Sequence, residues 1–303
     1  MSNQSNEIPR VTGLLVIEAR NSNPNGDPDR ESDPRMRSHD GRGMISDVSF
    51  KRKLRELVIA KDGPVWQEMK SMMGLEDAAY GIHVDQNTRD KAKSAKKEGE
   101  KKDLAGNHWD VRVFGSTALE EKDNFIRTGV VQFGLGVSAA KIRIQRDTNT
   151  VKANVDAGKN ADRGMAPLGF RVVEHGVYSM PFMINPTAAV KSGCEIKDIE
   201  LLCRLIPYAY SHNISRVRPF VEVRHAWYFQ HVNRLGSASD FAVIDSLTPS
   251  KPDPKEPSSA WDDYGYEGTS VISLARNRFD GRFSNFGDLC DPSFITQLFN
   301  PPQ

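Results

Sequence analysis

The sequence has few cysteines and no hydrophobic run long enough to cross a bilayer. Its three cysteines, Cys194, Cys203 and Cys290, are odd in number and show no C-x-x-C spacing, so no disulfide framework is expected. This usage suits a reducing compartment. The N-terminal residues Met1–Asn6 are polar and lack the apolar core of a signal peptide, so we expect no export. Together these absences predict a cytoplasmic protein without membrane contact.

Net charge is also nearly absent from the chain. Lys and Arg number 41 against 40 Asp and Glu, which leaves a formal charge of +1. No global basic field therefore indicates nucleic-acid binding. Any such surface must arise from local segregation of charge.

Signatures of enzymes and cofactor sites are missing as well. No G-x-x-x-x-G-K-[ST] occurs, no Ser or Cys lies in a recognisable nucleophile elbow, and Gly134-x-Gly136 alone is too weak for a nucleotide site. His225 and His231 share one face of a predicted strand, but a metal site needs a third ligand. We therefore expect no catalytic residue, no cofactor and no metal.

The stretch Val11–Val58 predicts a strand, a loop and a helix. Val11–Ala19 is apolar and β-branched at its centre, as in a buried strand. Asn21–Asp29 consists almost entirely of residues that favour turns. Ser46-Asp47 offers an N-cap to a helix over Val48–Val58, in which apolar residues recur at helical spacing.

This helix carries a basic edge. Lys51 and Arg55 lie one turn apart, with Arg52 and Lys53 beside them. Taken alone, a solvated surface helix explains the edge equally well. The preceding loop favours function, because loops longer than about 12–15 residues tend to be functional or disordered. Residues 35–55 hold seven Lys and Arg against two Asp, which suits a phosphate backbone.

The rest of the chain alternates strand and helix patterns. Asp147–Phe170 is polar, contains glycine and has strand-like flanks, which predicts a protruding hairpin-like arm. The charge run Arg89–Asp103 has nothing to bury and is either a solvated mobile segment or a finger that touches nucleic acid. Ser246–Gly265 predicts a loop. Strands are expected over Val111–Ser116, Gly129–Val137, Ala140–Arg146, Val172–Ile184 and Phe220–Val232, and helices over Val65–Leu75 and Ile196–Ile206.

In order, these elements run β-α-insertion-β-β-arm-β-α-β. With the flanks of the arm merged into one hairpin, this is the split βαβ order of a ferredoxin-like α+β fold. The aromatic signature of RNA-recognition motifs is not visible in the sequence. We therefore do not expect bases to stack on the face of the sheet.

Several motifs near the N-terminus carry a resemblance to a known family. They are Asn23-Pro24-Asn25-Gly26-Asp27-Pro28-Asp29, Asp33-Pro34, Gly41, Asp47-Val48 and Lys51-Arg52-Lys53-x-Arg55. Weaker echoes follow at Asp110-Val111-Arg112-Val113-Phe114-Gly115, Gly129-Val130-Val131-Gln132-Phe133 and Asp162-Arg163-Gly164-Met165. In order and spacing, this run strongly resembles the CRISPR-associated backbone proteins of type I Cascade complexes, the "Cas-seven" family, in its Csd/Csh branch of types I-C and I-B.

The resemblance implies an RNA-recognition-motif-like palm with a finger insertion and a thumb arm. Residues 1–303 would form a single RNA-binding domain, with the finger over 60–108, the thumb over 147–171 and a polar loop over 235–270. The implied function is that of a non-catalytic subunit that oligomerises head to tail along CRISPR RNA (crRNA). It would bind the sugar-phosphate backbone without sequence specificity and present the spacer to target DNA. Implied partners are crRNA, target DNA, neighbouring copies of itself, and the crRNA 5′-handle, large and small subunits of Cascade.

The candidate contacts follow from the motifs, the basic edge and the arm. The arm would reach the neighbouring subunit, where Met165 would wedge between bases and displace one nucleotide. The residues expected to bind RNA are Arg20, Asn21, Asn23, Asn25, Arg35, Arg37, Arg42, Lys51, Arg52, Lys53, Arg55, Lys152, Arg163, Met165, Arg216 and Arg218.

Two other function classes stay open. Backbone proteins of type III effectors cut target RNA with a loop aspartate, so Asp27, Asp29, Asp33 and Asp40 make a metal-dependent ribonuclease the rival hypothesis. Against it, two of these aspartates belong to an Asp-Pro-Asp turn, and no His or Glu companion lies at ligand spacing. The third class is a structural assembly protein that does not contact RNA.

Overall fold

The computed structural model describes residues 7–83, 104–118, 125–152 and 165–285. The strands are β1 (Val11–Ser22), β2 (Gly26–Asp27), β3 (Asp33–Pro34), β4 (Arg42–Ile45), β5 (Gly115–Ala118), β6 (Phe125–Thr128), β7 (Val131–Phe133), β8 (Gly136–Lys141), β9 (Ile144–Lys152), β10 (Met165–Ile184), β11 (Val221–His231) and β12 (Gly281–Asn285). The α-helices are α1 (Asp47–Ile59), α2 (Pro64–Met73), α4 (Leu104–Asn107), α5 (Trp109–Phe114), α6 (Pro186–Ser192), α7 (Ile196–Leu205), α8 (Asp240–Leu247) and α9 (Gly268–Arg278). Short 3-10 turns are η1 (Pro28–Arg30), η2 (Asp77–Ala79), η3 (Ile206–Tyr208) and η4 (Trp261–Tyr264).

An antiparallel sheet forms the centre of the protein. Its strands follow the order β12-β11-β1-β10-β8-β4, and β7 and β9 also pair with β10. The elements of the split βαβ motif follow the chain order β1-α1-β8-β10-α7-β11. Its four strands lie in the sheet order β11-β1-β10-β8. The ferredoxin-like α+β prediction is therefore confirmed.

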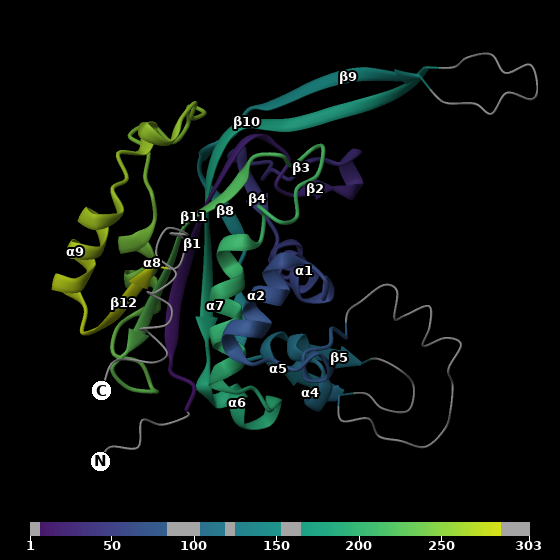
Figure 1. The fold of residues 1–303 in the computed structure, drawn as a ribbon. Coiled ribbons are helices and arrows are strands. Elements are labelled where there is room, and N and C mark those ends of the chain that lie inside the picture. Colours follow the sequence, from purple (N-terminus) through teal and green to yellow (C-terminus); the bar gives the residue numbers. More distant parts are fainter. Residues whose placement is uncertain (1–6, 84–103, 119–124, 153–164, 286–303) are drawn as a thin grey trace, which may run out of the picture.

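Both faces of β1 are buried, which explains its continuous apolar sequence. Leu15 and Ile17 belong to a core on the side of α1, α2 and α7. Leu14 and Val16 belong to a second core on the side of α8 and α9, so successive side chains serve opposite layers. Each such buried aliphatic side chain contributes about 1.5–3 kcal/mol. In Figure 1 the two helical layers lie on either side of the sheet.

The helix α1 forms for the reasons that its sequence indicates. Ser46 is the N-cap, and its Oγ accepts a hydrogen bond from the backbone N–H of Ser49 at 3.2 Å. Phe50, Leu54 and Leu57 are buried against the sheet. This packing holds the basic edge of α1 in a defined orientation next to the end of β1.

The second layer corrects one prediction. The stretch 235–270, predicted as a polar loop, contains the helix α8 and the first residues of the helix α9. Ser239 caps α8 by accepting a hydrogen bond from the backbone N–H of Ala242. Val243 and Leu247, one helical turn apart, are fully buried against β1 and β11. Apolar side chains lie on more than one side of this short helix, since Phe241 is exposed, so the segment showed little helical periodicity.

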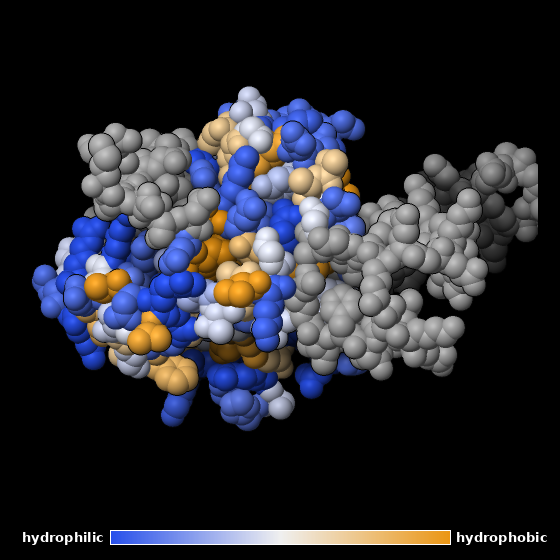
Figure 2. All heavy atoms as spheres, turned by 90° about the horizontal axis from the view of Figure 1, so that it is seen from below, coloured by the Kyte–Doolittle hydropathy of each residue, from blue (hydrophilic) through white to orange (hydrophobic). Residues whose placement is uncertain are grey.

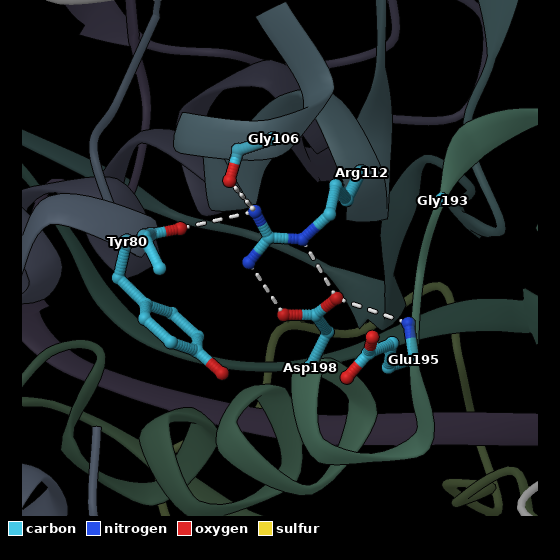
Figure 3. Close-up of a pocket in the computed structure, with 7 residues that line it drawn as sticks. Tyr80, Gly106, Arg112, Gly193, Glu195 and Asp198 are labelled. Carbon is cyan, nitrogen blue, oxygen red and sulfur yellow. Dashed lines mark hydrogen bonds and ion pairs between the residues drawn. The ribbon is translucent and has the colours of Figure 1, made fainter. Parts of the chain in front are cut away.

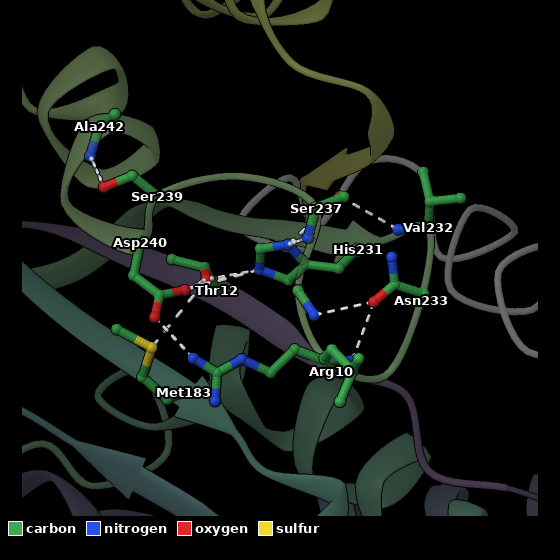
Figure 4. Close-up of polar contacts among 12 residues, drawn as sticks. Arg10, Thr12, Met183, His231, Val232, Asn233, Ser237, Ser239, Asp240 and Ala242 are labelled. Carbon is green, nitrogen blue, oxygen red and sulfur yellow. Dashed lines mark hydrogen bonds and ion pairs between the residues drawn. The ribbon is translucent and has the colours of Figure 1, made fainter.

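A polar network fastens α8 to the sheet (Figure 4). The guanidinium of Arg10 lies 2.5 Å from the carboxylate of Asp240, which also accepts a hydrogen bond from Thr12. Thr12 Oγ1 lies 3.0 Å from Nε2 of His231, and Nδ1 of His231 accepts a hydrogen bond from the backbone N–H of Ser237 at 2.9 Å. Burial lowers the pKa of His231, in opposition to the charge of Asp240. His231, one of the two histidines that share a strand face, thus takes part in this network.

A second polar network lies on the same face of β1. Nε2 of His175 is 3.0 Å from Oε1 of Glu18, and its Nδ1 is 2.8 Å from Oγ of Ser258. The hydroxyl of Tyr264 donates to the same Oγ at 2.8 Å. These contacts hold residues 258–264 over the sheet, so a face that is open in RNA-recognition motifs is covered here.

The strand predicted over Val111–Ser116 is wrong for most of its length. Residues Trp109–Phe114 form the helix α5, and only the following four residues form β5. All six side chains of α5 are buried. Asp110 and Arg112 alternate with Val111 and Val113, which is the pattern of a strand, and burial on every side leaves no exposed face to mark a helix.

The predicted hairpin-like arm is confirmed by the pairing of β9 with β10. Their register runs from Val173 opposite Ile144 to Met165 opposite Lys152. Figure 1 shows this pair projecting well beyond the sheet. The charge run Arg89–Asp103 lies outside the described residues, as does Arg163. Residues 64–73 of the predicted finger form α2, whose Trp66 is in the main core.

The end of the molecule away from the arm shows small groups of apolar side chains separated by hydrophilic ones (Figure 2). Among the described residues, no helix has the length and hydropathy that a membrane span requires.

Candidate nucleic-acid interface

The loop between β1 and α1 is a folded, backbone-strained unit. It contains the hairpin β2–β3 and the turn η1. Asn21, Glu31 and Ser32 have positive φ, and among the described residues no other non-glycine residue does. Such conformations cost of order 1–3 kcal/mol each and persist only where surrounding contacts impose them.

Two of the predicted RNA-binding asparagines supply these contacts. Asn23, which is 4% exposed, donates from Nδ2 to the carbonyl of Ser32 at 2.8 Å. Oδ1 of Asn25 accepts a hydrogen bond from the backbone N–H of Ser46, the N-cap of α1, at 2.8 Å. Both side chains therefore hold the loop and helix together. The side chain of Asn21, in contrast, is exposed.

The structure brings residues 213–220, the segment before β11 that we call the hinge, to this loop. The backbone N–H of Arg20 donates to the carbonyl of Phe220 at 2.9 Å, and Nε of Arg218 donates to the carbonyl of Asn23 at 3.0 Å. Arg216 is exposed in the same hinge. Figure 1 shows the hinge, in green, beside β2 and β3. Predicted site residues that are almost 200 positions apart in sequence are therefore neighbours.

The cations of α1 are paired with carboxylates. Lys53 is 8% exposed; burial lowers its pKa, and the hydrogen bond and charge of Glu56 raise it. The guanidinium of Arg55 also lies over the ring of Phe114, 5.2 Å from its centroid. The pairs are Lys51–Asp47 at 3.0 Å, Arg52–Glu56 at 2.8 Å, Lys53–Glu56 at 2.8 Å and Arg55–Asp110 at 2.9 Å.

Exposure separates these four cations. The side chains of Lys51, Lys53 and Arg55 are only 11–12% exposed, whereas that of Arg52 is 67% exposed. An exposed ion pair is weak and exchanges readily for a phosphate, but a buried pair does not. Of the basic edge, Arg52 is the residue whose charge is available to a ligand.

Two of the three arginines in the loop's second half contact one aspartate. Asp40 accepts hydrogen bonds from the guanidinium of Arg37 and from the backbone N–H of Arg42. Desolvation acts to raise the pKa of Asp40, but these two bonds and the charge of Arg37 hold it below its usual value. Arg35 lies nearer the hairpin, where its Nε donates to the carbonyl of Gly26 at 3.3 Å. All three guanidiniums remain partly exposed.

The base of the arm is bound to the same loop, which the sequence did not indicate. Arg146 lies 2.7 Å from Asp33, and Arg171 pairs with both Asp33 and Glu31. Arg171 is also the strand partner of Arg146 in the β9–β10 pair. Lys152 and Met165 are opposite each other further along the arm.

Three of the four loop aspartates of the rival ribonuclease hypothesis have partners in the structure. Asp27 caps η1 by accepting a hydrogen bond from the backbone N–H of Asp29, as expected of a turn former. Asp33 and Asp40 are paired with arginines. Within the part of the chain that the structure describes, no three His, Cys, Asp or Glu side chains gather in a metal-binding group.

A pocket of about 310 Å³ lies elsewhere, between α5 and α7 (Figure 3). Arg112 donates to both carboxylate oxygens of Asp198, at 2.8 and 2.9 Å, and to the carbonyls of Ala79 and Gly106. The backbone N–H of Glu195 donates to Asp198 as well. The charges of Arg112 and Asp198 neutralise each other, and this ion pair joins α5 to α7.

Comparison with solved structures finds CRISPR complexes at low sequence identity. A chain of a "CRISPR RNA-guided surveillance complex, pre-nicking" is similar with a TM-score of 0.49 and 15% identity, over 88% of this chain and 87% of that chain. A "CRISPR RNA-guided surveillance complex" chain has a TM-score of 0.46 and 13% identity, over 94% and 98%. A chain of a "Type III-B Cmr-beta bound to cognate target RNA" has a TM-score of 0.40 and 12% identity, over 73% and 61%.

No curated protein matches the sequence. A family model does: the one described as CRISPR-associated protein Cas7 matches residues 9–268, which is most of the chain. The match spans β1, the strained loop, the basic edge, the arm and the hinge before β11. The chain therefore belongs to the Cas7 family.

Proposed function

We propose that this protein is a non-catalytic backbone subunit of a type I CRISPR surveillance complex, in the Csd/Csh branch. It oligomerises along crRNA, binds the sugar-phosphate backbone without sequence specificity and presents the spacer to target DNA. Membership of the Cas7 family supports this proposal, and the motifs from Asn23 to Arg55 support the branch.

One structural observation carries the RNA-binding part of the proposal. The strained loop after β1, the hinge before β11 and the base of the β9–β10 arm converge at one end of the sheet. Together they bring exposed guanidiniums to one place in a chain of almost zero net charge. Phosphate contacts of this kind position an RNA without reading its sequence, which a protein that accepts any spacer requires.

The paired geometry divides the site residues by role. Lys51, Lys53 and Arg55 are assigned to the fold because their side chains are largely buried in ion pairs. Asn23 and Asn25 hold the loop. The residues proposed to contact the RNA backbone are Arg20, Asn21, Arg35, Arg37, Arg42, Arg52, Arg216 and Arg218, with Lys152 and Arg163 on the arm and Met165 as the wedge between bases.

Assembly follows from the arm. The residues 147–171 form the thumb, which reaches a neighbouring copy, and 60–108 form the finger of the same domain. Repeated head-to-tail contact produces an open helical filament. The near-neutral chain makes such stacking tolerable, because uniformly basic copies would repel each other. Other Cascade subunits bind the crRNA 5′ handle and the ends of the filament.

Co-expression with a repeat–spacer transcript tests this function. The purified protein should carry RNA, seen as a raised ratio of absorbance at 260 to 280 nm, and should elute as a multimer whose size follows the transcript length. Nucleic-acid-free monomers would contradict the proposal. Incubation of the complex with labelled target RNA and magnesium separates the rival hypothesis, since cleavage that is lost on Asp33→Asn or Asp40→Asn would establish a ribonuclease.

A further inference from the structure

The hinge before β11 exposes a large aromatic side chain. Phe220 is 65% exposed and Ile214, at the other end of the hinge, is 64% exposed. Single exposed apolar residues are common on protein surfaces. What distinguishes Phe220 is that its backbone bonds to Arg20 and that it follows Arg216 closely in the chain, both residues of the proposed RNA-binding surface.

The backbone that carries Phe220 is held on both sides. Its carbonyl accepts a hydrogen bond from the N–H of Arg20 at 2.9 Å, and its own N–H donates to Oγ of Ser22 at 2.9 Å. Residue 219, immediately before it, is a proline, whose ring fixes its own φ. Because this backbone is already ordered, binding through Phe220 costs little further backbone entropy.

The rest of the hinge is braced as well. Nδ2 of Asn213 donates to the carbonyl of Lys53 at 3.1 Å and to that of Ala209 at 2.9 Å. The N–H of Asn23 donates to the carbonyl of Val217 at 2.6 Å, and Ser215 pairs with Arg218 across the turn. These hydrogen bonds fasten the hinge to α1 and to the loop that follows β1.

Two exposed arginines belong to the surface that carries Phe220. Within the described residues, the exposed guanidinium of Arg216 has no ion-pair or hydrogen-bond partner. That of Arg20 is 56% exposed and has Glu18 as its partner. An aromatic plate with adjacent guanidiniums is the arrangement by which proteins hold single-stranded nucleic acid, with a base on the ring and phosphates on the cations.

We propose that Phe220 is a stacking platform for one nucleobase of a single strand held at this surface. This inference rests on the proposed function and adds a base contact to its backbone contacts. Stacking accepts every base, because each has a π-face, so the platform preserves binding without sequence specificity. One face of the sheet is covered by α8 and α9, so a base cannot stack there. The end of the sheet, where Phe220 lies, remains open to such a contact.

The test uses fluorescence anisotropy of the full chain with oligouridine and with a fully abasic ribose-phosphate oligomer of the same length. Phe220→Ala should weaken oligouridine binding about fivefold or more and leave binding to the abasic oligomer unchanged. Phe220→Trp should retain affinity, and Phe220→Leu should lose it despite its similar hydrophobicity. Phe241→Ala removes another exposed phenylalanine, on α8, and should change neither affinity.

Parallel arms with oligothymidine identify whether RNA or DNA supplies the base. Base-dependent loss with either polymer supports the platform, and absence of loss with both overturns it. A shift in the oligomeric state of the RNA-free protein on Phe220→Ala, without base-dependent loss, would also overturn it, because the ring would then contact another protein chain. Failure of the wild type to bind either oligomer would instead contradict the proposed function itself.

Discussion

The guanidinium of Arg146 lies 2.7 Å from the carboxylate of Asp33 and so joins the base of the β9–β10 arm to the strained loop after β1. Arg171, opposite Arg146 on the paired strand, contacts the same carboxylate. The orientation of the arm and the shape of the loop are therefore coupled through one side chain. In the proposed function both elements contact RNA, and this ion pair positions one relative to the other.

Asp33→Asn tests this coupling. Because the pairs are exposed on the arginine side, we expect the free energy of unfolding to change by less than about 1 kcal/mol. Hydrogen exchange should nevertheless accelerate at backbone amides of residues 26–34, and the exchange of α1 amides should not change. Unaltered exchange in the loop would show that the arm does not hold it.

Arg55 and Arg52 should differ sharply in their contribution to stability. Arg55→Ala removes a partner of Asp110, which is 1% exposed, and we expect a loss of about 3 kcal/mol in urea unfolding. Asp110→Asn in the same chain should recover part of that loss, because the buried charge is then gone. Arg52→Ala, at an exposed pair, should stay within about 0.5 kcal/mol. Equal losses would refute the assignment of Arg55 to the fold.

Arg216→Ala should lower the salt dependence of RNA binding. A side chain that neutralises one phosphate contributes about 0.7 to the slope of log affinity against log salt concentration for a single strand. We expect the slope to fall by that amount with the fold unchanged. Arg276→Ala, at an exposed arginine on α9 in the other layer, is the matched control and should leave the slope as it is. A similar fall of the slope in both variants would mean that the salt dependence reflects the overall charge of the protein and not a phosphate contact at Arg216.

Glu18 should make stability depend on acid pH. Burial acts to raise its pKa, but hydrogen bonds from His175 and Arg20, with the charges of Arg20 and Arg224, lower it from 4.5 to about 2. Since the folded pKa is lower than the unfolded one, the contribution is complete above about pH 4.5 and disappears as pH falls toward 2. It is on the order of 3 kcal/mol.

The measurement compares wild type with Glu18→Gln by chemical unfolding at several pH values. The difference in unfolding free energy should be largest near neutral pH and should shrink between about pH 4.5 and 2. Glu222→Gln changes an exposed carboxylate on the adjacent strand and provides the control. A difference that stays constant across this range would show that the pKa of Glu18 is not lowered by folding.

The sequence alone determined those features that depend on neighbouring residues. The buried strand β1, the capped helix α1, the turn at Asp27 and the hairpin arm all follow from local patterning and turn chemistry. The strand order of a ferredoxin-like fold followed from the succession of such elements. Local patterning was insufficient for α5 and α8, where burial rather than periodicity selected the helix.

Only the tertiary structure decided which charges are available. Four cations on one helix look alike in sequence, yet Arg55 is matched by Asp110, 55 positions away, while Arg52 faces solvent. Arg216 and Phe220 reach the loop after β1 only because β11 pairs with β1. The physical reason is that ion pairing and exposure depend on distances across the fold, which spacing along the chain does not specify.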